Sequence, residues 1–346
     1  MTRASTQATP TPFVSTKAIP PARDRLQSKI LVWIVVPILC YLTFTEFKIL
    51  LQMLSLEHGL LSLLDMMRGY FIASQGRYDN HVAQIIAVSV IFALAAWRLR
   101  AATVMAAACG GLICLLISTN LTAGYGTSVF HSGLTCLSLL FVLTFYATRL
   151  GREQQALAGL SESRRERNAA QVIANLGIAA FFASTAGWYI IAKCGWFGEF
   201  MGEKATARIY FAIPYMPMLA ALAEAAADTV SSEIGQAVGG TPFLLTTLRR
   251  VPPGTDGAIS LYGTLAGIAA AAIIAATGAP ALGMSAAECA VVFAAGIVGL
   301  FFDSLLGATV ERKGWIGNDL VNFTSTAFAA TVALFAIRFV QNDLLR

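Results

Sequence analysis

The sequence predicts an all-α fold: a polytopic transmembrane helical bundle with about nine spans and a cytoplasmic N-terminus. Of the 346 residues, 57% are hydrophobic and only 12% are charged, about half the charged fraction of a soluble domain. The mean hydropathy is +0.68. Apolar runs recur at about 20 residues, the length that crosses a bilayer as a helix. This composition excludes a disordered chain and a disulfide-stabilised scaffold.

The N-terminal part divides into two expected segments. Residues 1–29 are polar, rich in Ser, Thr and Pro, and contain no acid before Asp24, which predicts a disordered cytoplasmic tail. The first long apolar run starts near Ile30, too late and too long for a cleaved signal peptide. Residues 30–81 are expected to form an N-terminal membrane extension, and residues 82–346 the main transmembrane domain.

The spans follow from the apolar runs taken in order. They are predicted at 30–50, 82–97, 102–119, 130–148, 170–192, 207–226, 258–277, 284–302 and 321–340. For the segment 51–72 the sequence leaves two alternatives open, an amphipathic segment or a tenth span. With the N-terminus inside, most Lys and Arg residues outside the spans fall on the cytoplasmic side, as the positive-inside rule requires. The loops 149–169, 227–257 and 303–320 then share that face.

Composition also argues against several other classes of protein. The six cysteines form no CxxC pair, and the three histidines are far apart, so a zinc site is not expected. The net charge of +5 is modest and reflects loop orientation, so nucleic acid is not an expected partner. Compact loops and the short tail favour a bacterial inner membrane, with an organelle envelope as the alternative.

Acidic residues first gather at the end of the span near 226. Glu224 and Asp228 are four residues apart, so they share one helix face and repel unless a cation lies between them. A carboxylate at the end of an apolar span is costly and suggests function. Mg²⁺ resolves both problems, because it binds carboxylates together with substrate phosphates. Glu233 joins the site if the helix continues or bends. A helix end that simply surfaces into water is the alternative.

The loop 241–257 carries features that suit phosphate binding. Arg249 and Arg250 supply forked donors. Pro252 and Pro253 enforce a turn before a glycine-rich stretch whose backbone N–H groups can form an anion nest. That stretch is Gly254, Thr255, Asp256 and Gly257. The sequence therefore predicts a site for a nucleotide phosphate chain, with an ordinary basic loop as the alternative. Gly263 and Gly267 form a GxxxG pattern, which indicates close helix packing.

Acidic and amide side chains also flank the loop 303–320. Asp303 ends one span, where the helix dipole disfavours an anion, so a nearby cation is expected. Asp319 lies at the beginning of the next span. It is expected to be a metal ligand, and the alternative is that it caps the helix. Asn318 and Asn322 are four residues apart on that helix. The basic run 164–167 is attributed to topology, and Gln171 and Asn175 to contacts between helices.

Five strings occur in order and carry a resemblance: AAQVIANLG, ADTVSSEIG, PPGTDGAISLYGTLAG, DSLLGATVE and NDLVNF. They resemble the integral-membrane family that contains the plant phytyl phosphate kinase and human transmembrane protein nineteen. The match covers roughly residues 82–346. The layout is more distantly similar to phytol and dolichol kinases and CDP-diacylglycerol synthases.

The resemblance implies a lipid-phosphate kinase that converts a prenyl-type monophosphate to the diphosphate with a nucleoside triphosphate, CTP being favoured, and Mg²⁺. It adds Ser232 and Ser260 to the candidate site. It implies that Asp228, Asp256 and Asp303 are catalytic. The expected metal ligands are Asp228, Glu233, Asp303 and Asp319. A cytidylyltransferase that makes a CDP-lipid is the first alternative, and a transporter of small molecules or ions is the second.

Overall fold

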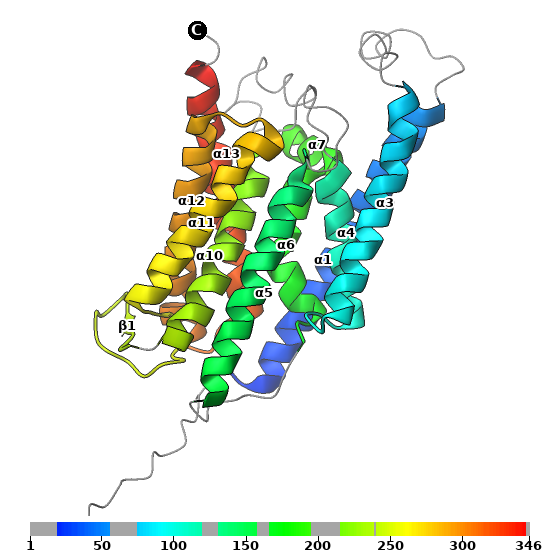
Figure 1. Ribbon diagram of the computed structural model, residues 1–346. Helices are drawn as coiled ribbons and strands as arrows, with labels where there is room; N and C mark the ends of the chain where they lie inside the picture. Colours follow the sequence, from blue (N-terminus) through cyan, green and yellow to red (C-terminus); the bar gives the residue numbers. More distant parts are fainter. Residues whose placement is uncertain are drawn as a thin grey trace, which may run out of the picture.

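The computed structural model describes residues 19–55, 75–119, 131–157, 166–194, 215–238 and 240–343. These residues form a bundle of roughly antiparallel helices with a two-stranded sheet at one end (Figure 1). The predicted segment 51–72 lies almost entirely outside this part of the chain, as does the tail before residue 19.

The helices follow the predicted spans in order. They are α1 (Pro21–Ser55), α3 (Gln75–Arg98), α4 (Val104–Thr119), α5 (Gly133–Leu157), α6 (Ala169–Ala183), α7 (Thr185–Lys193), α10 (Met216–Val238), α11 (Leu261–Leu282), α12 (Ala286–Leu306) and α13 (Asn318–Asp343). A short π-helix, η1 (Gly307–Glu311), continues α12. The strands β1 (Phe243–Leu244) and β2 (Ala258–Ile259) pair in antiparallel fashion between α10 and α11.

The fold is a membrane-spanning helical bundle, but the count of nine spans is not confirmed. Within the described residues, five helices are long and apolar enough to cross a bilayer: α1, α5, α11, α12 with η1, and α13. A sixth span results if α6 and α7 are taken together. The apolar parts of α3 and α4 are shorter than a full span. Helix α10 carries three acidic residues and lies inside the bundle.

Several predicted boundaries differ from the structure, and α5 and α10 continue past the predicted span ends at 148 and 226, to Leu157 and Val238. Helix α1 begins at Pro21, so residues 21–29 are helical where a disordered tail was expected. Proline is well suited to the first position of a helix, since it needs no hydrogen bond there. The predicted span 170–192 is broken at Ser184, where α6 and α7 meet at 77°. Ser184 caps α7 by accepting a hydrogen bond from the backbone N–H of Gly187 at 3.0 Å.

Helix α10 is the centre of the bundle. It packs against α5, α6, α11, α12 and α13, and its residues 216–227 are buried. Small residues bring α11 very close: a Cβ added at Gly263 would lie 2.5 Å from the carbonyl oxygen of Ser231, and one at Gly267 2.8 Å from that of Ala227. The GxxxG pattern therefore serves helix packing, as predicted. This packing fixes the lower part of α10 relative to the loop before α11.

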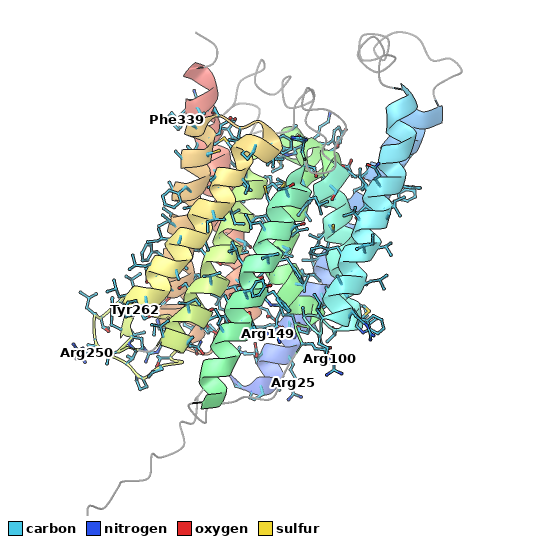
Figure 2. The ribbon with its side chains drawn as sticks, viewed as in Figure 1. Arg25, Arg100, Arg149, Arg250, Tyr262 and Phe339 are labelled. Carbon is cyan, nitrogen blue, oxygen red and sulfur yellow. The ribbon has the colours of Figure 1, made fainter. Side chains whose placement is uncertain are left out.

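Basic side chains gather at one end of the bundle. Figure 2 shows Arg25, Arg100, Arg149 and Arg250 at the end that carries the sheet, opposite the C-terminus. Lys313 and Trp315 in the α12–α13 loop form a cation–π pair with 5.2 Å from Nζ to the ring centroid, and both residue types are frequent next to a membrane surface. The positive-inside rule associates this end with the cytoplasm.

Candidate active site

A cavity of about 400 Å³ lies where the basic end of the bundle meets the loop between α10 and α11. Its walls come from α5, α6, α10, the 240–260 loop, α12, η1 and α13. The structure brings most of the predicted site residues to this one cavity. They are Asp228, Ser232, Glu233, Gly254, Thr255, Asp256, Gly257, Ser260, Asp303, Asn318 and Asn322.

Helix α10 supplies the first acidic wall. Asp228 and Ser232 are one turn apart, so both side chains reach the cavity from one helix face. Glu224, one turn deeper than Asp228, does not line the cavity and is only 1% exposed. One of its carboxylate oxygens, Oε1, is buried and has no hydrogen-bond partner among the residues that the structure describes. The acidic face of α10 therefore continues below the floor of the cavity.

Asp303 enters from the end of α12. The hydroxyl of Ser325 on α13 donates a hydrogen bond to Asp303 Oδ2 at 3.1 Å. Asp303 also interacts electrostatically with Asp228, Glu224 and Glu311. Like charges this close near the end of α12 are stabilised by a nearby cation or by protonation of a carboxyl group. The structure thus concentrates negative charge between α10 and α12.

The loop that enters α11 is folded tightly against the end of α12. The Thr255 backbone N–H and hydroxyl donate to the carbonyl oxygen of Pro252 at 3.3 and 2.7 Å. Gly254 and Gly257 have positive φ angles of 80° and 69°. A Cβ added at Gly257 would lie 2.5 Å from the carbonyl carbon of Gly307. Glycine at 257 is therefore required both by its backbone conformation and by its neighbour.

Ser260 has a structural task as well as a place in the cavity lining. As the N-cap of α11, its hydroxyl accepts a hydrogen bond from the backbone N–H of Gly263 at 3.2 Å. The cap fixes where the loop ends and α11 begins. Ser260 thereby holds the glycine-rich turn beside η1.

Arg167 is the basic residue of the site that sequence reasoning missed. It lines the cavity and interacts electrostatically with Asp228. Its backbone is held by Ala101 and Thr103: its N–H donates to Ala101 at 3.1 Å, and its carbonyl accepts from Thr103 at 3.0 Å. The useful signal was the capping box that follows, Asn168 to Gln171, which places Arg167 directly at the start of α6.

Other polar residues of the cavity lining were not predicted as site residues, and Gln171, Asn175 and Glu311 are among them. The sequence attributes Gln171 and Asn175 to contacts between helices, whereas the hydrogen bond from Asn175 Nδ2 to the carbonyl oxygen of Gln171, at 2.8 Å, lies within α6 itself. Glu311 belongs to the π-helix η1 and is 6% exposed. π-Helical turns are often found at functional sites. The spacing of Glu311 relative to Asp303 gives no clear signal in the sequence.

Three predicted residues lie elsewhere. Arg249 and Arg250 are exposed and do not line the cavity, because pairing with β1 turns their segment away from it. Asp319 also lies outside the cavity lining. It is 9% exposed, and its Oδ2 accepts a hydrogen bond from the hydroxyl of Ser28 on α1 at 2.6 Å. These positions leave Asp228, Glu233 and Asp303 of the four expected metal ligands in the cavity.

The charge of the cavity indicates what it can bind. Among the described residues that line it, five are acidic and one, Arg167, is basic. The acidic residues are Asp228, Glu233, Asp256, Asp303 and Glu311. An anionic ligand alone would be repelled, whereas one bound together with divalent cations would not.

The arrangement of the acids bears on how a metal would be held. In the described part of the chain, no three His, Cys, Asp or Glu side chains converge on one metal position. Mg²⁺ is commonly held by one or two carboxylates, with the remaining positions taken by phosphate and water. Asp228 and Asp303 suit that type of binding.

Comparison with known proteins places the chain in a family. Residues 87–330 match the model of the family described as integral membrane protein DUF92. Protein VTE6, chloroplastic, of Arabidopsis thaliana is 29% identical over 234 residues, 67% of this chain, which spans 65% of the length of VTE6. No solved structure matches.

Further relatives come from other branches of life. A membrane protein of Synechocystis is 30% identical over 56% of this chain and 72% of its own length. A membrane protein of Methanocaldococcus jannaschii is 32% identical over 58% of this chain and 74% of its own length. These matches confirm the family that the sequence motifs indicated. The chain belongs to the DUF92 family of integral membrane proteins.

Proposed function

We propose that the chain is an integral-membrane kinase that phosphorylates an isoprenoid, phytyl- or prenyl-type monophosphate to the diphosphate with a nucleoside triphosphate, CTP favoured, and Mg²⁺. The observation that carries the proposal is the cavity itself. It combines carboxylates, one guanidinium and a glycine-rich turn at the polar end of a membrane bundle. The similarity to VTE6 and the motifs shared with the phytyl phosphate kinase family support the same reaction class.

The proposed reaction needs little covalent participation by the protein. An oxygen of the acceptor phosphate attacks the terminal phosphorus of the nucleotide. The bond from that phosphorus to the bridging oxygen breaks, and the nucleoside diphosphate leaves. Because the acceptor phosphate is already ionised, no strong general base is required. Catalysis then depends on positioning and on charge neutralisation.

The cavity residues divide into two groups under this proposal. Asp228 and Asp303 would hold Mg²⁺, which neutralises charge on the donor phosphates. Arg167 would bind a phosphate oxygen through its forked donors. The turn 254–257 would hold the triphosphate against η1. The clustering of acids at one end of the bundle, away from its middle, favours this function over transport.

The test is transfer of label by the purified protein in detergent with Mg²⁺. CTP or ATP labelled at the γ-phosphate is offered together with prenyl alcohols and prenyl monophosphates, and the lipid products are separated. We expect label in a prenyl diphosphate and a loss of roughly 100-fold or more in Asp228→Asn and Asp303→Asn. Glu288→Gln, at the opposite end of α12, is the control and should retain activity.

Two results would overturn the proposal. Entry of α-label from CTP into lipid, with the γ-phosphate excluded, would identify a CDP-lipid-forming cytidylyltransferase. Absence of label from every donor and acceptor, in a protein that unfolds cooperatively on heating, would favour binding or transport. In either case the wild-type protein and the control variant Glu288→Gln must give the same labelling result.

A further inference from the structure

Arg249 and Arg250 belong to a small hairpin beside the cavity. Phe243 of β1 pairs with Ile259 of β2 on one side and with Arg250 on the other. Adjacent paired strands lie about 4.8 Å apart, so the Arg250 backbone is roughly 10 Å from β2. Because β2 leads directly into α11, the two arginines lie close to the first turn of that helix.

The tip of the hairpin presents an apolar side chain. Leu248 is 73% exposed and has a φ of 53°, which is uncommon for any residue but glycine. Its backbone N–H donates to Leu244 at 2.8 Å, and the N–H of Leu244 donates to the carbonyl of Arg249 at 3.1 Å. Leu244 is 4% exposed, so the tip is anchored in the bundle. The strained conformation holds Leu248 outward beside Arg249.

Helix α11 continues this surface with an apolar stripe. Leu261, Tyr262 and Leu265 are 66%, 57% and 55% exposed. Positions 261 and 265, and 262 and 265, are neighbours on one helix face. Figure 2 shows Tyr262 and Arg250 on the same flank of the cavity-bearing end. Two guanidinium groups therefore lie beside an apolar face that belongs to a membrane span.

We propose that this surface recruits the lipid phosphate acceptor from the membrane. The hairpin surface consists of Leu248, Arg249, Arg250, Leu261, Tyr262 and Leu265. This inference rests on the proposed function and specifies its acceptor as a long-chain lipid monophosphate. Arg249 and Arg250 bind the phosphate at the membrane boundary, and the chain lies in lipid along α11. The charges of phosphate and arginine are complementary, and forked donors suit phosphate oxygens.

The same segment connects this surface to the cavity. Arg250 is followed by Val251 and the two prolines, and Pro253 is the first residue of a continuous stretch, through Ala258, that lines the cavity. A phosphate bound at the arginines is therefore beside the loop that faces the proposed donor. The arginines are outside the cavity lining, so this assignment replaces the role in nucleotide binding that the sequence predicted for them.

The test compares two acceptors that differ in chain length. The double variant Arg249→Gln/Arg250→Gln is assayed in nanodiscs of neutral lipid with a C20 prenyl monophosphate, and in parallel with a water-soluble C5 prenyl monophosphate. We expect the KM for the C20 acceptor to rise about tenfold, the loss of roughly one charge-assisted hydrogen bond. The kcat and the KM for the nucleotide should remain unchanged. The kinetics with the C5 acceptor should also remain unchanged, because this acceptor enters the cavity from water and does not pass the membrane boundary where the arginines lie.

A matched variant controls for the loss of two positive charges. Arg312→Gln/Lys313→Gln removes two exposed basic residues from the α12–α13 loop at the same end. It should leave the KM for the C20 acceptor unchanged. An equal change with both acceptors, or a raised KM for the nucleotide, would overturn the inference. So would a C20 effect that an excess of phosphatidylglycerol abolishes, since ordinary anionic lipid would then be the occupant.

A binding measurement separates failure of the inference from failure of the proposed function. Retention of the C20 monophosphate is measured on the Asp303→Asn protein, with and without the two arginine substitutions. Retention that depends on the arginines supports the inference that the hairpin surface binds the acceptor. This holds even if the wild-type protein transfers no phosphate, a result that would overturn only the proposed kinase function. Retention that does not depend on them overturns the surface and leaves the kinase to its own assay.

Discussion

Ser28 near the start of α1 donates a hydrogen bond to Asp319 at the start of α13 over 2.6 Å, although the two residues are 291 positions apart. Gln27 beside it donates to the carbonyl of Trp315 and accepts from the N–H of Gly317, both at 2.8 Å. Helix α1 thus holds the loop that precedes α13. The family match covers residues 87–330, so Gln27 and Ser28 lie outside it, whereas their partners in the α12–α13 region lie inside it.

The first prediction concerns this contact. Ser28→Ala removes the donor to a buried carboxylate and should lower the free energy of unfolding by about 1.5–3 kcal/mol. Ser28→Thr keeps the hydroxyl and should cost less. Thermal unfolding in detergent measures both. Asp319→Asn should also lower the midpoint without changing the Mg²⁺ dependence of activity. A raised Mg²⁺ requirement with unchanged stability would instead make Asp319 the metal ligand that the sequence predicted.

The second prediction compares two glycines of the same turn. Both have positive φ, so alanine costs about 1–2 kcal/mol at either position. At Gly254 no atom of the described residues lies within 4 Å of an added Cβ, whereas at Gly257 the added atom meets the backbone of Gly307 and Ala308. Gly257→Ala should therefore displace the loop from η1 and abolish phosphoryl transfer, while Gly254→Ala retains most of it. Equal activity of the two variants would mean that the contact with η1 is unimportant.

Much of the fold was predictable because hydrophobicity along this chain is periodic at membrane length. Asp228 and Asp303, at the ends of apolar runs, could also be predicted as site residues, because a carboxylate at such a position is costly and indicates a function. The loop 254–257 was recognisable from its Pro and Gly content. Close packing of α10 with α11 and α12 brings these three parts to one cavity. In the sequence, only the pattern of small residues predicts this packing.

Where the placement of a charged side chain differs from the expectation, backbone pairing or a partner distant in sequence decides where the side chain points. Arg167 looked like part of a topological basic run, yet its backbone bonds to the α3–α4 connection turn it into the cavity. Arg249 and Arg250 looked like phosphate ligands of the cavity, yet pairing with Phe243 directs them outward. Asp319 pairs with α1. None of these contacts is encoded by local spacing.

The third prediction tests Arg167, the basic residue that faces the carboxylates of the cavity. Arg167→Gln should reduce phosphoryl transfer by roughly 100-fold, the typical effect of removing one donor that stabilises transition-state charge. Arg167→Lys should recover only part of the loss, because it lacks the fork. Arg149→Gln, an exposed residue at the same end of the bundle, is the control (Figure 2). Similar activities of Arg167→Gln and Arg149→Gln would remove Arg167 from the site.

The fourth prediction concerns the break between α6 and α7. Glu46 on α1 is 7% exposed and accepts hydrogen bonds from the backbone N–H of Thr185 and from its hydroxyl, the latter at 3.2 Å. An N–H group left unpaired in an apolar region is costly, so Glu46→Leu should lower the thermal midpoint more than Glu46→Gln, which keeps a carbonyl acceptor. Tyr41→Leu, exposed on the same helix, should have little effect.

Activity separates two explanations of a Glu46 defect. The break lies toward the end of α6 that is far from Arg167, so a purely structural role predicts a lower midpoint with normal kinetics below it. Equal midpoints for Glu46→Leu and Glu46→Gln would show that no acceptor oxygen is needed at position 46 to pair with the Thr185 N–H. A changed KM for the acceptor at temperatures where the protein stays folded would mean that the bend in the α6–α7 pair is coupled to the cavity through α6, which carries Gln171 and Asn175.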